Sequence, residues 1–439
     1  MTRHYLDHAS TTRLRPEAAQ AMAEAVGRLA AGEAGDPARL HAEGRLVREA
    51  VEAARAQVAS FLGVRPRQVV FTAGATEAAN AAIFGAVARA TGDPVGAKAA
   101  GTGPPPRTAA SPPVVVCAAV EHSCVRDPSR RWGAVREPTV DAEGRIDPGS
   151  VVASLDDLAR APVGRAPVGR APVGRGHVGR GHVAPSPSTI AEDLAAAGGP
   201  LALVNCQWAN HEVGTIQPVA EIVAACRGHS IPVHVDAAAA AGHVPMDLGA
   251  LDADFVSVSS HKLGGPPGAG ALVIRRGLRV DPLVIGGDQE RGRRAGMENV
   301  VGIVGFGAAA AAIEHRGVGG EAEVARKQTE RAVAAALAVG GVRTFGASDD
   351  RLPHVVCLGI NDVEPEAVLL GLDQEGVAVH SGSACSSEAL EPSPVLAAMG
   401  ADADHSLRVS VGWSTTDADV DAFCAAFARV VGRLRALAG

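Results

Sequence analysis

The sequence lacks the features that indicate nucleic-acid binding, membrane insertion or secretion. It has no basic block longer than a few residues, and its formal charge is −7 with a pI near 6.1. This balance argues against nucleic-acid and membrane-surface partners and favours small or acidic ones. The longest uncharged apolar stretch, residues 300–313, is too short and too rich in Gly and Ala to span a bilayer. The start, MTRHYLDHAS, has no apolar signal region, so we expect a cytoplasmic protein.

Cysteine pairs are also missing. The seven cysteines make an odd number and include no CxxC pair, which fits neither a disulfide framework nor a zinc site. Most are expected to be buried as small hydrophobic residues. Cys385 differs from the other six because it lies among small hydroxyl residues in SGSACSS, which makes it the candidate for an exposed nucleophile.

With 439 residues, 47% of them hydrophobic, the chain is long enough for two or three globular domains. Strands alternate with helices as far as Ile274, which predicts an α/β fold with a mostly parallel, doubly wound sheet and a smaller α+β unit after it. We expect a large domain over 14–278 and a small one formed by 1–13 and 279–439. The expected strands are 68–72, 114–117, 201–205, 232–236, 255–259 and 271–274, and the main expected helices are 16–29, 40–62, 78–89, 218–227 and 300–314.

Two segments are predicted to be disordered loops, 92–113 and 161–187. The first is rich in Gly and Pro, and the second contains a five-residue repeat, APVGR three times followed by GHVGR and GHV. Such a repeat cannot bury an apolar face, although its regular arginines leave a weak anion-binding arm as an alternative.

The segment 252–275 carries the residue with the clearest chemical potential. Its strand 255–259 delivers Ser260-His261-Lys262 into a turn rich in Gly and Pro, and a second strand follows at once. Lysine is rare in this sequence. At the end of a buried strand Lys262 would be partly desolvated, as a Schiff-base lysine requires; an ordinary solvated loop lysine is the alternative.

Three further positions combine a strand end with a polar residue. The strand 68–72 leads through a glycine turn to Ala75 and Thr76 before a helix, which suits an anion cradle or an ordinary capped helix. His122 follows the strand 114–117, where open α/β sheets bind ligands, although a lone histidine is more often structural. Asp236 ends a β-branched run and suits either a partner for a ring nitrogen or an N-cap for residues 237–241.

Ten short segments, given in chain order at the end of this paragraph, together resemble the cysteine desulfurases of the class V aminotransferase-like group. These are pyridoxal-phosphate enzymes of fold type I that supply sulfur for iron-sulfur clusters and thionucleosides. The resemblance covers nearly the whole chain outside the two insertions and implies a homodimer, L-cysteine as substrate and a sulfur-acceptor protein, either an iron-sulfur scaffold or a tRNA-thiolation enzyme. The segments are YLDHASTT, LHAEG, VVFTAGATEAAN, VEH, ANHEVG, HVDA, SSHKLGGPPGAGAL, ERGRRAG, SGSACSSEALEPS and LRVSVG.

The resemblance also implies a role for each matching residue. Lys262 corresponds to the Schiff-base lysine, His122 to the imidazole stacked on the cofactor ring, and Asp236 to the partner of the ring nitrogen. The expected phosphate cradle consists of Ala75, Thr76, Ser259 and His261. Arg408 corresponds to the clamp on the substrate carboxylate. Cys385 corresponds to the sulfur-accepting nucleophile, and the resemblance gives it a transient contact with an iron-sulfur cluster as well.

Four positions depart from the family pattern. His211 stands where the cofactor hydroxyl usually meets an asparagine, and Ala239 replaces the usual glutamine near the ring. Met297 replaces a threonine that reaches the neighbouring subunit's phosphate, and Asp36 replaces an asparagine near the expected substrate carboxylate. Each lost neutral hydrogen bond costs about 0.5–1.5 kcal/mol, so we expect looser cofactor binding than in relatives.

Two other functions compete with desulfuration. One is a different class V enzyme, a selenocysteine lyase or an aminotransferase; the other is a non-catalytic dimeric scaffold of the same fold, suggested by the departures. The joint presence of Lys262, His122, Asp236, Arg408 and Cys385 argues against a scaffold, which needs none of them.

Overall fold

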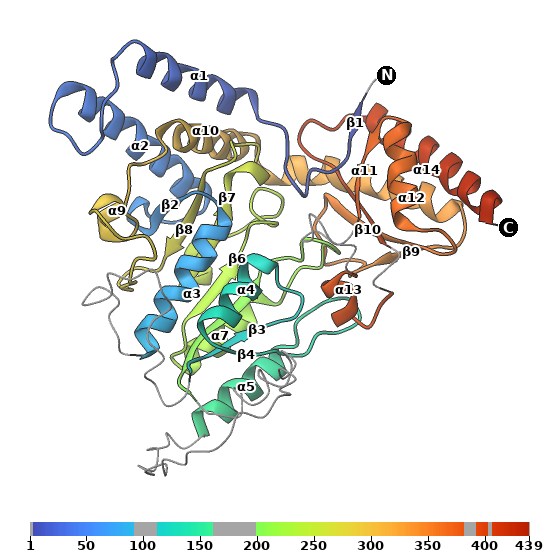
Figure 1. Ribbon diagram of the computed structural model, residues 1–439, viewed down its shortest axis with the longest axis horizontal. Coiled ribbons are helices and arrows are strands. Elements are labelled where there is room, and N and C mark those ends of the chain that lie inside the picture. The colour runs from blue at the N-terminus through green and yellow to red at the C-terminus, as the bar shows by residue number, and fades with distance from the viewer. Residues whose placement is uncertain (1–2, 92–111, 161–198, 382–391, 403–405, 439) are drawn as a thin grey trace, which may run out of the picture.

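The structure, a computed structural model, describes residues 3–91, 112–160, 199–381, 392–402 and 406–438 (Figure 1). The predicted insertions lie outside these residues, except for Pro112 and Pro113. The first half contains β1 (His4–Tyr5), α1 (Pro16–Ala30), α2 (Ala42–Phe61), the 3₁₀ turn η1 (Pro66–Gln68), β2 (Val69–Thr72), α3 (Ala75–Thr91), β3 (Val114–Cys117), α4 (Ser123–Trp132), β4 (Ala134–Arg136) and α5 (Pro148–Arg160).

The second half begins with β5 (Leu201–Gln207), α7 (Val219–Gly228), β6 (Val233–Asp236), α8 (Leu248–Leu251), β7 (Phe255–Ser259), η2 (Ser260–Lys262), β8 (Gly270–Ile274), α9 (Gln289–Gly292), α10 (Val300–Arg316) and α11 (Val318–Ala338). It ends with β9 (Val342–Phe345), β10 (Val355–Ile360), α12 (Pro365–Gln374), β11 (Val377–Ala378), β12 (His380–Ser381), α13 (Pro394–Ala398), β13 (Ser406–Ser410) and α14 (Asp417–Ala438).

A seven-stranded sheet in the order β2-β8-β7-β6-β5-β3-β4 forms the centre of the large unit. The pairs from β7 to β4 are parallel, whereas β8 is antiparallel to both of its neighbours. β8 is antiparallel to β7 because only residues 260–269 join the two strands, which is shorter than the crossover that parallel strands need. The predicted mostly parallel sheet is therefore confirmed.

Helices cover both faces of this sheet. α3 packs against β5, β6, β7 and β8, and its alanines face a core that includes Val70, Val115 and Phe255. On the other face α2 and α7 bury a second core around Val58, Val204 and Val235. The short strands are buried on both faces, which explains their unbroken β-branched runs.

The small unit contains an antiparallel sheet in the order β12-β13-β10-β9, packed against α11, α12 and α14. The N-terminal strand β1 pairs with β11, so residues 4–5 belong to the small unit. Figure 1 shows the two units side by side, with the small one at the right. α10 packs against α1 and α2 of the large unit. This packing favours a boundary later than residue 278, and the boundary itself stays a prediction.

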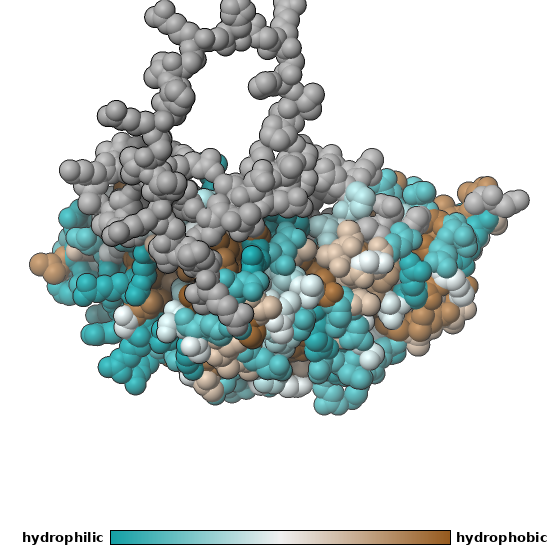
Figure 2. Space-filling model, turned by 90° about the horizontal axis from the view of Figure 1, so that it is seen from below, coloured by the Kyte–Doolittle hydropathy of each residue, from teal (hydrophilic) through white to brown (hydrophobic). Residues whose placement is uncertain are grey.

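The surface seen from below carries hydrophilic residues over most of its described part, with smaller hydrophobic areas between them (Figure 2). None of the described helices is both long and apolar enough to cross a membrane.

Candidate active site

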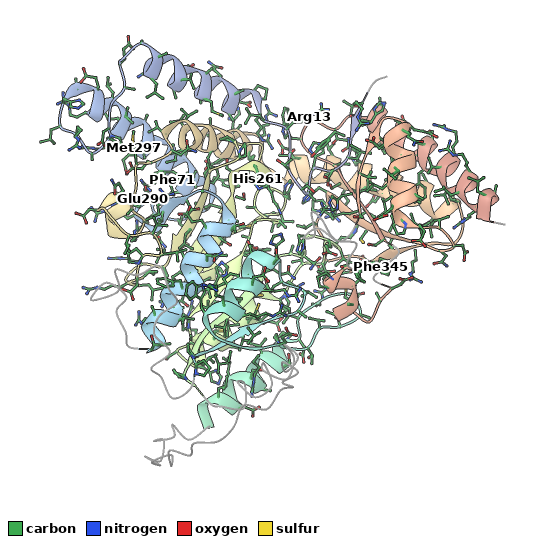
Figure 3. All side chains as sticks on the ribbon, viewed as in Figure 1. Arg13, Phe71, His261, Glu290, Met297 and Phe345 are labelled. Carbon is green, nitrogen blue, oxygen red and sulfur yellow. The ribbon has the colours of Figure 1, made fainter. Side chains whose placement is uncertain are left out.

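A cavity of about 950 Å³ lies at the carboxyl ends of the parallel strands. In Figure 3, His261 marks its place near the junction of the two units. The polar side chains that line it come from strand ends, from the start of α3 and α4 and from β13. It gathers nearly all the predicted cofactor and substrate residues: Ala75, Thr76, His122, His211, Asp236, Ser259, His261, Lys262 and Arg408.

Lys262 reaches this cavity from η2, a turn whose backbone conformation is fixed by hydrogen bonds and by glycines. The Ser260 N–H donates to the Ala269 carbonyl at 3.1 Å, and the Ser260 carbonyl accepts from the N–H groups of Leu263 and Gly265. Gly264 and Gly268 have φ values of 82° and 75°, which strongly favour glycine. The glycine-rich sequence after Lys262 is therefore required to fold the backbone sharply behind the lysine.

Asp236 lies at the carboxyl end of β6, and the structure shows what holds its carboxylate. Oδ1 accepts from the Ser257 hydroxyl at 2.9 Å and from the Ala238 N–H at 3.1 Å. The following residues 237–241 form turns rather than a regular helix, so the alternative of a helix N-cap is not observed. The Asp236 charge also acts on the buried Glu121, whose pKa is raised to about 8 by burial and by this charge.

The turn before α3 forms a backbone cradle. A Cβ atom on Gly270 would lie 2.5 Å from the Gly74 Cα, so glycine at this position lets β8 pack directly against the turn. α3 begins at Ala75, three residues earlier than predicted, which places Ala75 and Thr76 in its first turn with N–H groups that have no partner within the helix. Burial and the Lys262 charge lower the pKa of His261 to about 4.

Two of the histidines that line the cavity, His122 and His211, pack against each other. His122 precedes α4, and its Nδ1 accepts from the Cys124 N–H at 3.1 Å, which leaves the Nε2 atom of a neutral ring to carry the proton. The ring of His211 packs edge-on against it, with centroids 4.8 Å apart. His211 Nε2 lies 3.6 Å from the Glu212 carboxylate.

Arg408 is buried, with 1% of its surface exposed, yet it lines the cavity. Its guanidinium donates to the His211 carbonyl at 2.9 Å, to Ser10 Oγ at 2.6 Å and to the Asp7 carboxylate at 3.1 Å. Its buried Nε has no hydrogen-bond partner among the described residues. A buried guanidinium with an unsatisfied donor suits the recognition of a carboxylate.

These residues fit pyridoxal phosphate. A lysine, a carboxylate at a strand end and a helix N-terminus with free N–H groups correspond to the aldehyde, the ring nitrogen and the phosphate of that cofactor. Ser259 and His261 flank the same cavity. Ala239 also lines it and offers no hydrogen bond to a ligand, as the sequence predicted.

Two positions singled out in the sequence do not line this cavity. Asp36 is not among its lining residues; its carboxylate accepts from the Ala38 N–H at 2.8 Å and pairs with Arg39, so its substrate role stays a prediction. Met297, which was expected to face the neighbouring subunit, is 58% exposed and lies away from His261 in the view of Figure 3. Cys385 lies outside the described residues.

Within the described residues, no group of three or more His, Cys, Asp or Glu side chains is arranged to hold a metal ion. The predicted iron-sulfur contact of Cys385 involves a residue outside this set and stays a prediction.

Sequence reasoning missed Asp7 and Glu121 as parts of the site. Both stand in motifs that were recognised, YLDHASTT and VEH. The Asp7–Arg408 contact joins positions 401 residues apart, so no local pattern could reveal it.

Comparison with known proteins agrees with this geometry. The family model for class-V aminotransferases matches residues 4–97 and 189–423. The chain therefore belongs to the class-V aminotransferase family, and the predicted pyridoxal-phosphate cofactor is confirmed with it.

Its full-length relatives include the IscS-like cysteine desulfurase of Mycobacterium tuberculosis, 36% identical over 98% of this chain and 97% of the relative. The cysteine desulfurase of Cereibacter sphaeroides is 34% identical over 100% of this chain and 98% of the relative. A solved structure described as a NifS-like protein is 26% identical with a TM-score of 0.75, covering 99% of this chain and 100% of that one. The family that the ten motifs indicated is thus confirmed.

Proposed function

We propose that this chain converts L-cysteine to L-alanine and passes the sulfur to Cys385, using the residues gathered in the cavity. Its full-length similarity to cysteine desulfurases supports the reaction, and no finding favours a lyase of selenocysteine, an aminotransferase or a scaffold. The single observation that carries the assignment of residues is that Lys262, Asp236, His122 and Arg408 line one cavity although they come from distant parts of the chain.

Each side chain has a distinct task in this proposal. Pyridoxal phosphate, when bound, supplies the electron sink that lets bonds at the substrate Cα and Cβ break. Asp236 would pair with the protonated ring nitrogen of this cofactor, and the first turn of α3 would hold its phosphate. Arg408 holds the carboxylate of cysteine, and the amine of Lys262 removes the proton from its Cα.

The sulfur step belongs to other groups. The Cys385 thiolate attacks the substrate sulfur, so that a sulfur–sulfur bond forms while the carbon–sulfur bond breaks and its electron pair stays with carbon. His122, with a proton on Nε2, is placed to move a proton at the cavity wall. Alanine leaves, and the sulfur stays on Cys385 as a persulfide.

The test is direct. Protein loaded with pyridoxal phosphate is given L-cysteine and a thiol reductant, and alanine and sulfide are measured in equal amounts. Lys262→Ala removes both products. Alanine formation by Lys262→Ala at the parental rate contradicts the assignment.

We also propose a cytoplasmic homodimer in which the loop 289–297 reaches the partner's active site. Met297 is exposed in the single chain although it is apolar, and α9 holds the start of this loop firmly against the large unit. A sulfur-acceptor protein, for iron-sulfur cluster assembly or tRNA thiolation, would receive the persulfide sulfur. Sedimentation of a stable and fully active monomer would exclude the dimer.

A further inference from the structure

Asp236 is the end of a buried hydrogen-bond relay that crosses three strands of the sheet. Its Oδ1 lies 2.9 Å from Ser257 Oγ, which lies 3.1 Å from His234 Nε2. The other ring nitrogen of His234, Nδ1, lies 2.9 Å from Asn205 Oδ1.

The relay continues from Asn205 into α4. In the orientation that the structure gives the amide, Asn205 Nδ2 donates to Ser129 Oγ at 3.2 Å, and the Ser129 hydroxyl donates to the Val125 carbonyl at 2.6 Å. We call Ser129, Asn205, His234, Ser257 and Asp236 the relay. The first four are at most 2% exposed and Asp236 is 7% exposed, so bulk water does not supply protons to these contacts.

The relay has one more contact than it has hydrogen atoms that can be donated along it. The Asp236 carboxylate at one end, and the Val125 carbonyl that follows Ser129 at the other, can only accept, and five contacts lie between them. Ser129, Ser257 and a neutral His234 contribute one proton each, and Asn205 contributes one because its oxygen must accept on the other side. A charged His234 would supply the missing proton, but burial lowers its pKa to about 4, so the ring is neutral near pH 7.

One contact of the relay therefore has no proton between its two atoms, and we call it the empty contact. Its position decides toward which end the hydrogen bonds of the relay are donated. If His234 carries its proton on Nδ1, its Nε2 and the Asp236 carboxylate both require the single Ser257 proton. An unsatisfied contact beside a buried charge costs more than one between two neutral groups. The longest contact, 3.2 Å between Asn205 and Ser129, lies at the far end and joins neutral groups. Because an amide has the same shape in both orientations, Asn205 can turn its NH₂ toward His234 and leave that contact empty.

We propose that His234 is a positioning residue for Asp236, with a neutral ring that carries its proton on Nε2 and directs the Ser257 hydroxyl onto Asp236 Oδ1. The Ala238 N–H donates to the same oxygen, so both bonds hold Oδ1. No hydrogen bond to Oδ2 is present in the described part of the chain. Oδ2 therefore would be the oxygen left to pair with the ring nitrogen of the cofactor, a consequence that rests on the proposed function.

The proton position can be measured without any catalysis. Apoprotein with ¹⁵N-labelled histidine is studied by NMR near pH 7, and the His234 ring is identified as the signal that His234→Gln removes. We expect a protonated Nε2 and an unprotonated, accepting Nδ1. A ring protonated on Nδ1, or on both nitrogens, overturns the proposal.

Two matched substitutions then test its consequence for the cofactor. Ser257→Ala and Ser129→Ala delete the same hydroxyl from equally buried sites of the relay. Ser257→Ala should weaken pyridoxal-phosphate binding about tenfold, the size of one hydrogen bond to a charged group, and shift the pH profile of the bound cofactor's visible absorbance. Ser129→Ala should change binding by less than about twofold, because only neutral bonds at the far end are lost.

His234→Gln keeps an N–H donor near the position of Nε2 and should restore most of the affinity that His234→Phe loses. Equal losses in Ser257→Ala and Ser129→Ala, or no rescue by glutamine, contradict the proposal. If Ser257→Ala, Ser129→Ala or His234→Phe does not fold, the NMR result on the unaltered protein still decides, because its assignment uses only His234→Gln. Failure of desulfuration with the expected tautomer and affinities would instead remove the proposed function alone.

Discussion

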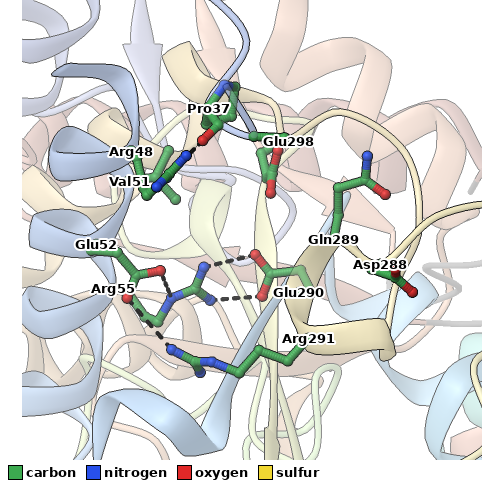
Figure 4. A pocket seen from close by; sticks show the side chains of 11 residues that line it. Pro37, Arg48, Val51, Glu52, Arg55, Asp288, Gln289, Glu290, Arg291 and Glu298 are labelled. Carbon is green, nitrogen blue, oxygen red and sulfur yellow. Dashed lines mark hydrogen bonds and ion pairs between the residues drawn. The ribbon is translucent and has the colours of Figure 1, made fainter. Parts of the chain in front are cut away.

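The pair Arg55–Glu290 anchors α9 and the start of the 289–297 loop to α2 (Figure 4). The guanidinium donates twice to the carboxylate, at 2.6 and 2.7 Å, and the two side chains are only 4% and 1% exposed. Glu290 also accepts from the Phe71 N–H at 3.0 Å, and Arg55 lies over the Phe71 ring at 4.6 Å. Glu290 holds this place at a φ of 48°, in the left-handed region.

Glu290→Gln removes the buried counter-ion of Arg55 and leaves only the half-exposed Glu52, whose carboxylate lies 3.0 Å from Arg55 Nε. Removing one partner of a buried pair costs about 3–5 kcal/mol, and we expect a value near 3 kcal/mol because glutamine keeps one acceptor. Chemical denaturation should show this as a lower urea midpoint with an unchanged slope. Because α9 carries the loop that leads to Met297, the variant should also shift the monomer–dimer equilibrium toward monomer.

The matched control is Glu137→Gln. Glu137 pairs with Arg130 at 3.1 Å, but these side chains are 45% and 49% exposed, so its loss should cost less than about 1 kcal/mol. Arg55→Met combined with Glu290→Gln should be less destabilised than Glu290→Gln alone, since no buried charge remains. Equal midpoints for Glu290→Gln and Glu137→Gln would refute the reasoning.

Three further predictions concern acid stability, cofactor affinity and the repeat. Burial lowers the pKa of His243 to about 4, below its value of about 6.5 in the unfolded chain. The free energy of unfolding should therefore fall as the pH drops from about 6.5 toward 4, by up to roughly 3 kcal/mol for this residue. His243→Phe, which keeps a ring against His354, should flatten that dependence; an unchanged slope would show that other groups cause it. Ala239→Gln with Met297→Thr should tighten cofactor binding roughly tenfold in equilibrium dialysis, whereas equal or weaker retention means that the site already compensates. Deleting residues 161–183 should leave folding and cofactor binding intact, and precipitation of the deletion variant would show that the repeat packs on the protein.

The sheet could be predicted because its strands are short, buried and rich in β-branched residues, and because turn residues separate them. β3, β6 and β7 begin or end within a residue of the predicted positions. The start of α3 was predicted three residues late because residues 73–77 were taken as a turn around Gly74, whereas the helix begins directly after that glycine, at Ala75. The position of α10 against α1 and α2 has no local signal at all, since it depends on which apolar face each helix meets.

In the site, too, residues with a local sequence signal could be predicted and those placed by tertiary contacts could not. Lys262, Asp236 and His122 could be found because each follows a strand, and strand ends meet at one edge of the sheet. The relay behind Asp236 could not be found, since His234 and Ser257 look like ordinary strand residues until β6 and β7 are placed side by side. Asp36 accepts from the Ala38 N–H in its own turn, and its expected role beside the substrate stays a prediction.

The most direct test of the proposed reaction is mass spectrometry of the protein after a single turnover with L-cysteine. The proposal predicts one extra sulfur atom on Cys385 and one alanine released per active site. Cys385→Ala should keep the cofactor bound to Lys262 and lose the extra sulfur. A persulfide on another cysteine, or alanine formed at the parental rate by Cys385→Ala, would contradict it.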